Sequence, residues 1–259
     1  MKIKARFLVV VGLAAAVIVA CGSVAEELER ASQEVTPTAT SAASTPGRSE
    51  QPQGQARQTP TSERKIEVSG AGFAQSDRLI YYAFIVVNRN EREAAERTSY
   101  QVAFLDDTGR VVARDSGYIT FLFPGETQGV AGNASVGEGV RPARIQVQVS
   151  SPSAWTELNV KSKLTAEVQS VAPQRFLGPK VSGVVNNPFT VELKQIRVSI
   201  VAYDAAGNII GGEFTYVDFV PAGGQAPFEE TLWQGAQPAK VEAYAAISGL
   251  TALDLQQRR

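Results

Sequence analysis

The chain has 259 residues, with 25 basic and 26 acidic side chains, one cysteine and no histidine. The lack of histidine excludes catalytic groups that use an imidazole base, and it excludes imidazole metal sites. Because the chain is nearly neutral and has no basic cluster, we expect no nucleic-acid partner.

The first 20 residues have the organisation of an export signal. Lys2, Lys4 and Arg6 are followed by residues 7–20, which carry no polar side chain. Fourteen residues span about 21 Å as a helix, less than the roughly 30 Å of a bilayer core. The pattern predicts a signal peptide at 1–20. The alternatives are an ordinary secretory peptide or a short membrane anchor in which the cysteine is incidental.

The run Ile18-Val19-Ala20-Cys21 resembles the box at which bacterial lipoproteins are cleaved and acylated. An unpaired cysteine in an exported protein needs an explanation, and lipidation supplies one. The resemblance implies that Cys21 carries a diacylglyceryl group, often with a further acyl chain such as palmitate. Each buried methylene contributes about 0.8 kcal/mol, so two or three chains anchor stably. We therefore expect an exported protein, anchored by acylated Cys21 in the membrane lipid of the cell membrane or outer membrane and facing the periplasm or the cell exterior.

Residues 21–63 have the composition of a linker. Thr, Ser, Pro, Ala, Gln and Gly dominate residues 36–62, which contain no aromatic side chain. Such a stretch buries too little apolar surface to offset the cost of ordering, and we predict disorder. Roughly 43 residues of flexible coil span about 35–40 Å. The linker is interpreted as a spacer between the lipid and the folded part.

The rest of the chain, from about residue 64 to residue 255, contains one pattern twice. The matching landmarks are Val86-Val87-Asn88 with Val184-Val185-Asn186, Asp106–Gly109 with Asp204–Gly207, and Pro142–Ile145 with Pro238–Val241. The offsets are 98, 98 and 96 residues. This period is the size of a domain, so we predict two tandem domains, at 64–152 and 153–256.

Both copies show the two-residue hydrophobic period of strands. Examples are Tyr100, Val102 and Phe104 in the first copy and Val241, Ala243 and Ala245 in the second. Six or seven short strands in about 90 residues predict an all-β chain of two immunoglobulin-like antiparallel β-sandwiches. We also expect a central strand at Leu79–Val87, an irregularity at Lys194-Gln195, and one helical turn at Glu91–Arg97.

The segment Val181–Phe228 resembles an FxLYD domain through Gly183-Val184-Val185-Asn186, Ile200–Asp204 and Gly207. The first copy, through Val102–Asp106, resembles a more divergent member. An aliphatic residue, Val102 or Ile200, occupies the motif's Phe position. The resemblance implies small β-sandwich modules on exported prokaryotic proteins, often lipoproteins, without an established common activity.

The search for chemistry yields no catalytic residues, no metal site and no cofactor. Ser135 lies in a segment predicted to be a surface turn, and no histidine is present to activate it. Asp106-Asp107 is interpreted as a turn cap, and the alternative, a calcium site, requires further oxygen ligands. Glu229-Glu230 is interpreted as a solvated strand end, because adjacent residues of a strand point to opposite faces.

Trp155 and Trp233 are expected to pack in a core or between domains, and the alternative is contact with a protein or glycan. The resulting hypothesis is a non-enzymatic, lipid-anchored envelope protein that presents two sandwiches to an envelope protein or polysaccharide. The alternative function is a ligand- or carbohydrate-binding lipoprotein, or a carbohydrate-processing one. It needs paired carboxylates or a platform of aromatics in an interdomain cleft. A third possibility is a structural spacer within an envelope complex.

Overall fold

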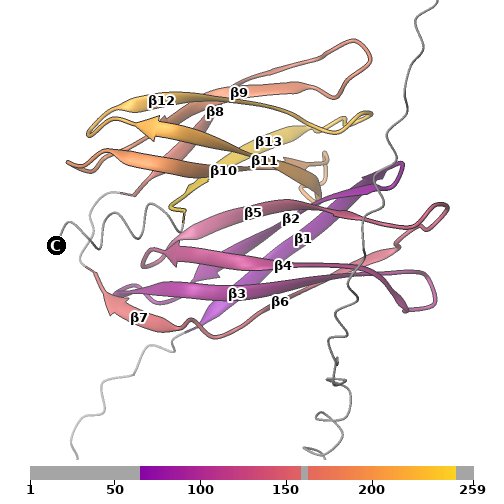
Figure 1. The fold of residues 1–259 in the computed structure, drawn as a ribbon, viewed down its shortest axis with the longest axis horizontal. Coiled ribbons are helices and arrows are strands. Elements are labelled where there is room, and N and C mark those ends of the chain that lie inside the picture. The colour runs from indigo at the N-terminus through magenta and orange to yellow at the C-terminus, as the bar shows by residue number, and fades with distance from the viewer. Residues whose placement is uncertain (1–64, 159–162, 249–259) are drawn as a thin grey trace, which may run out of the picture. The chain divides into compact units, whose positions relative to one another are not determined.

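The structure is a computed structural model that describes residues 65–158 and 163–248 (Figure 1). Within these ranges every regular element is a β-strand, so the predicted all-β class is confirmed. No helix in the described ranges has the length and apolarity needed to cross a bilayer. The predicted signal peptide, Cys21 and the linker 21–63 lie outside the described residues.

The first sandwich contains seven strands: β1 (Ile66–Ser76), β2 (Leu79–Asn88), β3 (Glu93–Leu105), β4 (Val111–Leu122), β5 (Thr127–Ser135), β6 (Arg144–Val149) and β7 (Ala154–Glu157). One sheet has the order β1-β2-β5 and the other has the order β4-β3-β6, with β7 also paired to β3. Alternate residues of β2 and β3 point inward and form the core between these sheets. This core includes Tyr82, Phe84, Val102 and Phe104.

The second sandwich contains six strands: β8 (Thr165–Ala172), β9 (Lys180–Asn186), β10 (Leu193–Tyr203), β11 (Ile209–Val220), β12 (Gln225–Thr231) and β13 (Lys240–Ala246). Its sheets have the orders β12-β9-β8 and β11-β10-β13. Val185, Leu193, Val198 and Ile200 lie in its core. Apart from β7, which has no counterpart among β8–β13, these orders repeat those of the first sandwich, as the two-copy pattern predicts.

The repeat also extends to backbone irregularities. Arg97 in β3 and Gln195 in β10 have left-handed φ values of 47° and 53°. Each is skipped in the pairing with the next strand, although the register is the same before and after it. The register shifts instead between Phe104 and Leu105 and between Ala202 and Tyr203, again at matching places in the two copies. The expected irregularity at Lys194-Gln195 is therefore confirmed.

One landmark is shifted by a residue from the sequence-based match. Asn88 is 1% exposed and its counterpart by contacts is Asn187, which is 2% exposed. Nδ2 of Asn88 donates to the carbonyls of Glu93, Leu122 and Phe123 at 2.8–3.3 Å. Nδ2 of Asn187 makes the same three types of bond at 2.8–3.4 Å. Asn186 is only partly buried, so the matching offset here is 99 rather than 98.

The expected domain boundary at 152/153 places one strand in the wrong sandwich. Residues 154–157 form β7, which pairs with Glu93–Glu96 of the first sandwich. The N–H of Leu158 also bonds to Arg92 O at 3.0 Å. The expected helical turn at Glu91–Arg97 is also wrong, because most of this segment is the first part of β3. The backbone of this part of β3 pairs with β7 on one side and with β4 on the other.

The two sandwiches pack on each other through the sheets β1-β2-β5 and β11-β10-β13, so that four sheets follow one another as layers (Figure 1). Ala83, Ile85 and Ala131 meet Val201 in a buried apolar cluster between them. Strand β2 is therefore covered on both faces. This explains the continuous apolar run from Leu79 to Val87, since such runs are typical of strands buried on both sides.

Small side chains let these two sheets approach closely. A Cβ atom at Gly212 would lie 2.5 Å from Ile200 O, 2.8 Å from Ala83 Cβ and 3.0 Å from Ala131 Cβ. Glycine is therefore required there by space rather than by backbone conformation.

Polar and aromatic contacts fix the same interface. Arg197 of the second sandwich donates from Nη2 to Ala131 O of the first at 2.5 Å, while its guanidinium lies 3.9 Å from the Phe214 ring centroid. Phe123, from the first sandwich, stacks on Phe189, from the second, with ring centroids 6.0 Å apart. The sandwiches are thus joined by more than apolar area.

Candidate functional site

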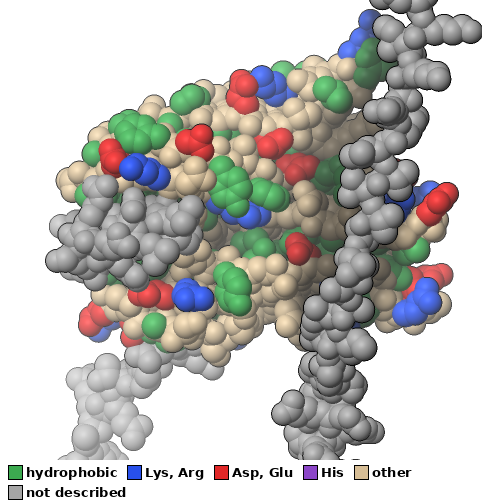
Figure 2. All heavy atoms as spheres, viewed as in Figure 1, with side chains coloured by type: hydrophobic (Ala, Val, Ile, Leu, Met, Phe, Trp, Pro, Cys, Tyr) green, Lys and Arg blue, Asp and Glu red, His purple; other side chains and the backbone are tan. Residues whose placement is uncertain are grey.

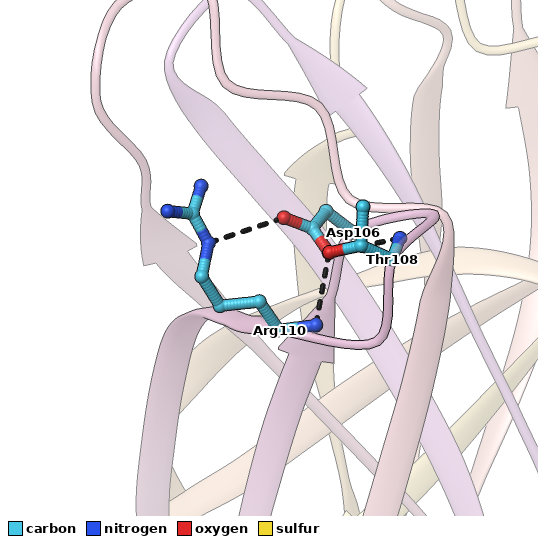
Figure 3. Close-up of polar contacts among 3 residues, drawn as sticks. All are labelled: Asp106, Thr108 and Arg110. Carbon is cyan, nitrogen blue, oxygen red and sulfur yellow. Dashed lines mark hydrogen bonds and ion pairs between the residues drawn. The ribbon is translucent and has the colours of Figure 1, made fainter.

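The acidic turn after β3 is the first candidate from the sequence (Figure 3). Asp106 Oδ1 accepts hydrogen bonds from the N–H groups of Thr108 (3.1 Å) and Arg110 (2.9 Å), and from Thr108 Oγ1 (2.6 Å). Oδ2 lies 3.3 Å from Arg110 Nε. The Thr108 hydroxyl, followed by bonds from Arg110, lowers the pKa of Asp106. Both oxygens are occupied within the turn, so the carboxylate caps the turn.

The second sandwich contains the same turn. Asp204 Oδ1 accepts from the N–H groups of Ala206 (2.9 Å) and Asn208 (2.8 Å). The side chain of Asn208, and then its N–H, lower the pKa of Asp204. In the described part of the chain, no three Asp, Glu or Cys side chains gather in positions suited to a metal ion. Because both copies contain this aspartate-capped turn in the same form, we interpret it as a structural feature of the fold.

Glu229 and Glu230 diverge, as expected for neighbours in a strand. Glu229 forms an ion pair with Lys180 at 2.6 Å. Glu230 accepts from the N–H of Thr231 and lies near Glu213 of β11. Burial, with a further contribution from the charge of Glu230, raises the pKa of Glu213 to about 7.

Sequence reasoning missed this pairing of Glu213 with Glu230. The available signal is the alternation in β11, where Glu213 shares a face with the buried Val217. A carboxylate on the inner face of a strand is desolvated, which is what raises its pKa. Which residue faces it from β12 depends on how the two sheets pack, and the sequence does not specify that.

The remaining residues singled out in the sequence are structural. Ser135 ends β5, opposite Leu79, so the segment before it is a strand rather than the predicted surface turn. Trp155 lies in β7 and packs on the first core. Trp233 is buried and stacks on Tyr81 of the other sandwich, with ring centroids 5.7 Å apart. Both tryptophans therefore pack as expected, in a core and between domains.

A pocket of about 200 Å³ lies at the rim of the contact between the sandwiches. Glu126 and Gln128 line it from the first sandwich, and Lys163 and Thr165 line it from the second. Glu126 is 9% exposed, and its Oε2 accepts a hydrogen bond from Phe123 N–H at 2.6 Å. Burial raises the pKa of Glu126 to about 7, although that N–H and the charge of Lys163 act in the opposite direction.

The pocket offers two groups for binding or chemistry, the carboxyl group of Glu126 and the side-chain oxygen of Gln128. Gln128 is buried, and its Oε1 has no hydrogen-bond partner in the described part of the chain. Glu126 is the one carboxylate among the lining residues. Sugar hydrolysis generally uses two carboxylates, so this pocket lacks the pair that carbohydrate processing requires.

The outer surface provides the other candidates. Figure 2 shows acidic, basic and hydrophobic side chains interspersed over the visible face rather than gathered by sign. Among the described residues, the most exposed large hydrophobic side chains are Phe176 (77%), Tyr118 (68%) and Leu177 (62%). Phe176 and Leu177 are adjacent in the loop between β8 and β9, whereas Tyr118 lies within β4. This loop is the one place where two strongly exposed apolar residues of the described chain are neighbours in sequence.

No family model matches this chain, and no curated protein matches it. Among solved structures, the chain is similar to red sea bream transglutaminase over 71% of its own length and 27% of that protein's length. The sequence identity is 12% and the TM-score is 0.26. A likeness this low carries no argument about function, so the function has to be inferred from the chain itself.

Proposed function

We propose that this chain is a non-enzymatic, lipid-anchored protein of the cell envelope that presents two FxLYD-like sandwiches to an envelope protein or polysaccharide. The run Ile18–Cys21, after the positive and apolar segments, supports export and lipidation at Cys21. The aromatic-free linker that follows supports a folded part held away from the lipid.

The observation that carries this proposal is the packed layer between the sandwiches. Ala83, Ala131 and Val201 are buried there, and Gly212 admits no side chain. A partner therefore meets two sandwiches in one fixed arrangement. Such preorganisation favours binding, because little conformational freedom is lost when the partner docks.

The acidic residues also support a role without catalysis. Asp106 and Asp204 are occupied by turn hydrogen bonds, and Glu229 is paired with Lys180. Catalytic acids and bases need an accessible proton and a partner group in a cleft. The carboxylates that the sequence singled out are used within the fold instead.

A second candidate function follows from the pocket at the rim. Glu126 and the unpartnered Gln128 Oε1 are both hydrogen-bond acceptors in a partly apolar recess. They suit a small ligand with N–H or O–H donors. This candidate corresponds to ligand binding at the interdomain junction without a hydrolytic step.

Photo-crosslinking in living cells tests the proposal. A photoreactive residue at Tyr118, Tyr216 or Phe219, all exposed, would be compared in the native chain and in a Cys21→Ser chain. We expect the native chain to fractionate with membranes and to give a specific crosslinked partner from one of the three positions. A native chain that fractionates with soluble proteins, or that gives the same adducts from all three positions, contradicts the proposal.

A further inference from the structure

We propose that the loop between β8 and β9, residues 173–179, is a membrane-contacting tip that places Phe176 and Leu177 in the interfacial region of a lipid bilayer. This contact is separate from the lipid expected on Cys21. It would orient the folded block on the membrane that the anchor holds nearby.

The first observation is the exposure of apolar area at the end of a hairpin. Phe176 is 77% exposed and Leu177 is 62% exposed. Val171, near the end of β8, is a further exposed aliphatic side chain. Scattered apolar residues are ordinary on a protein surface, but neighbouring ones on a projecting loop indicate an interaction site.

The second observation is that the fold does not require this loop. In the first sandwich the equivalent strands β1 and β2 are joined by two residues, Asp77 and Arg78. In the second sandwich β8 ends at Ala172 and β9 begins at Lys180, so seven residues make the same connection. The ribbon in Figure 1 shows the connection between β8 and β9 reaching past the ends of its strands. Strand pairing therefore does not determine whether the additional residues of this loop are polar or apolar.

The third observation is that the base of the loop is fixed while its tip points outward. Leu232 N–H donates to Pro179 O at 3.0 Å. A Cβ atom at Gly178 would collide with the carbonyl oxygens of Leu232 and Trp233, so the loop backbone lies directly on that segment. Phe176 adopts a left-handed φ of 72°, which is uncommon for a bulky residue. Strained backbone of this kind persists only where the neighbouring chain holds it, as the segment at Leu232 and Trp233 does beside Gly178.

The charge of the loop favours a bilayer as its occupant. Arg175 lies over the Phe176 ring, 5.0 Å from the centroid, and the loop contains no acidic residue. A basic residue beside an aromatic and an aliphatic side chain suits the boundary between anionic headgroups and acyl chains. Two side chains alone bind a membrane weakly, so a tether is needed to raise their effective concentration.

The length of the chain before the fold provides that tether. If residues 21–63 form the linker that their composition predicts, they would span about 35–40 Å. A block tethered to the bilayer over this distance meets its surface repeatedly. This step depends on the proposed anchor, whereas the affinity of the tip for lipid does not.

The test supplies the tether chemically, so that it does not depend on acylation in cells. Residues 21–259, which include every described residue, would be coupled through Cys21, the only cysteine, to a maleimide lipid in phosphatidylcholine–phosphatidylglycerol vesicles. Phe176→Trp would report lipid contact through quenching by brominated lipids. Tyr118→Trp, at an equally exposed position of the first sandwich, is the matched control.

We expect brominated lipids to quench the fluorescence of F176W at least threefold more than that of Y118W, after subtraction of the native tryptophans. Adding Leu177→Ser to F176W should abolish the excess. Equal quenching at the two positions, or an excess that L177S leaves unchanged, overturns the proposal. Unfolding midpoints equal to that of the parent chain would show that the variants are folded. An N-terminus found unlipidated in cells would count against the proposed function and not against lipid contact by the tip.

Discussion

The two sandwiches have the same strand order, but they differ in a few side chains and in one loop. The features that they share are hydrogen bonds within the fold, whereas the features that occur once are a buried acid and an exposed loop. Asp106 with Asp204, and Asn88 with Asn187, make matching bonds in both copies. Glu126 and the loop at 173–179 occur once, because Gly224 and the two-residue turn at Asp77 stand at the corresponding places. Repeated contacts are explained by the fold, so function is to be sought among the unrepeated ones.

The contact between the sandwiches is the feature whose disruption should have the largest effect. Gly212→Val places methyl groups where Ile200 O, Ala83 and Ala131 already lie. Overpacking against rigid backbone should lower the free energy of unfolding by about 3 kcal/mol. Urea denaturation measures it, with Gly137→Ala as the control, since a Cβ there meets only Val140 Cγ2 at 3.4 Å. Equal stability of the two variants would show that the sandwiches do not pack as described.

Glu126 should make stability depend on pH in a way that its counterpart Gly224 cannot. Burial raises its pKa to about 7 from 4.5, so the folded state favours the neutral acid. Its stabilising contribution is complete below pH 4.5 and is lost as the pH rises through about 7. At about 1.4 kcal/mol per pKa unit, the contribution of Glu126 to the free energy of unfolding should fall by about 3 kcal/mol over this range.

Urea denaturation between pH 4 and pH 8 checks this pH dependence. Glu126→Gln should remove most of that decline, because the amide keeps an acceptor for Phe123 N–H and carries no charge. Glu213→Gln is the companion variant, since the pKa of Glu213 is also raised to about 7, by burial and by Glu230. An E126Q chain that keeps the full decline would contradict the assignment to Glu126.

The buried asparagines should have nearly equal effects in the two copies. Asn88→Ala and Asn187→Ala each remove the side-chain donor to three backbone carbonyl groups, in bonds that are buried or partly buried. We expect a loss of about 2 kcal/mol in each case. Asn186→Ala, at the neighbouring, partly buried position, removes only hydrogen bonds that are exposed to solvent and should change stability by less than about 0.5 kcal/mol. A large effect at Asn186 with none at Asn187 would restore the sequence-based offset.

The turn aspartates should show the smallest effect. Asp106→Ala and Asp204→Ala remove acceptors of turn hydrogen bonds, and both variants should lower the thermal midpoint slightly and alike. Because hydrogen bonds lower both pKa values, the contribution is present above pH 3.8 and fades as the pH falls below it. Calorimetry at pH 7 and pH 3 checks this, and a marked difference between the two turns would indicate a separate role for one of them.

The sequence predicted the local structure better than the packing. Period-two alternation and the Asp–Gly spacing identified the strands and both turns, because these depend on residues near one another in the chain. The counterpart of Asn88 could not be identified from the sequence, because Asn186 and Asn187 are adjacent and differ only in their burial. The pairing of Ala154–Glu157 with β3, and of Glu213 with Glu230, depends on distant segments. Nothing local in the sequence specifies either one.

The sequence predicted the packing of one sandwich on the other only in part. The unbroken apolar run at Leu79–Val87 predicted a central strand, and a strand covered on both faces fits that run. The partner for its second face is the outer face of β10, where Val201 and Ser199 are buried. Small residues such as Gly212 carry no hydrophobic signal, so the close approach of the two sheets at this position left no trace in the periodicity.

The mass of the mature N-terminal peptide, isolated from membranes, tests the central claim most directly. We expect the chain to begin at Cys21 and this residue to carry a diacylglyceryl group, with or without a further acyl chain. An unmodified Cys21, or a mature chain that begins elsewhere, would contradict the claim that this two-sandwich block is tethered to a membrane.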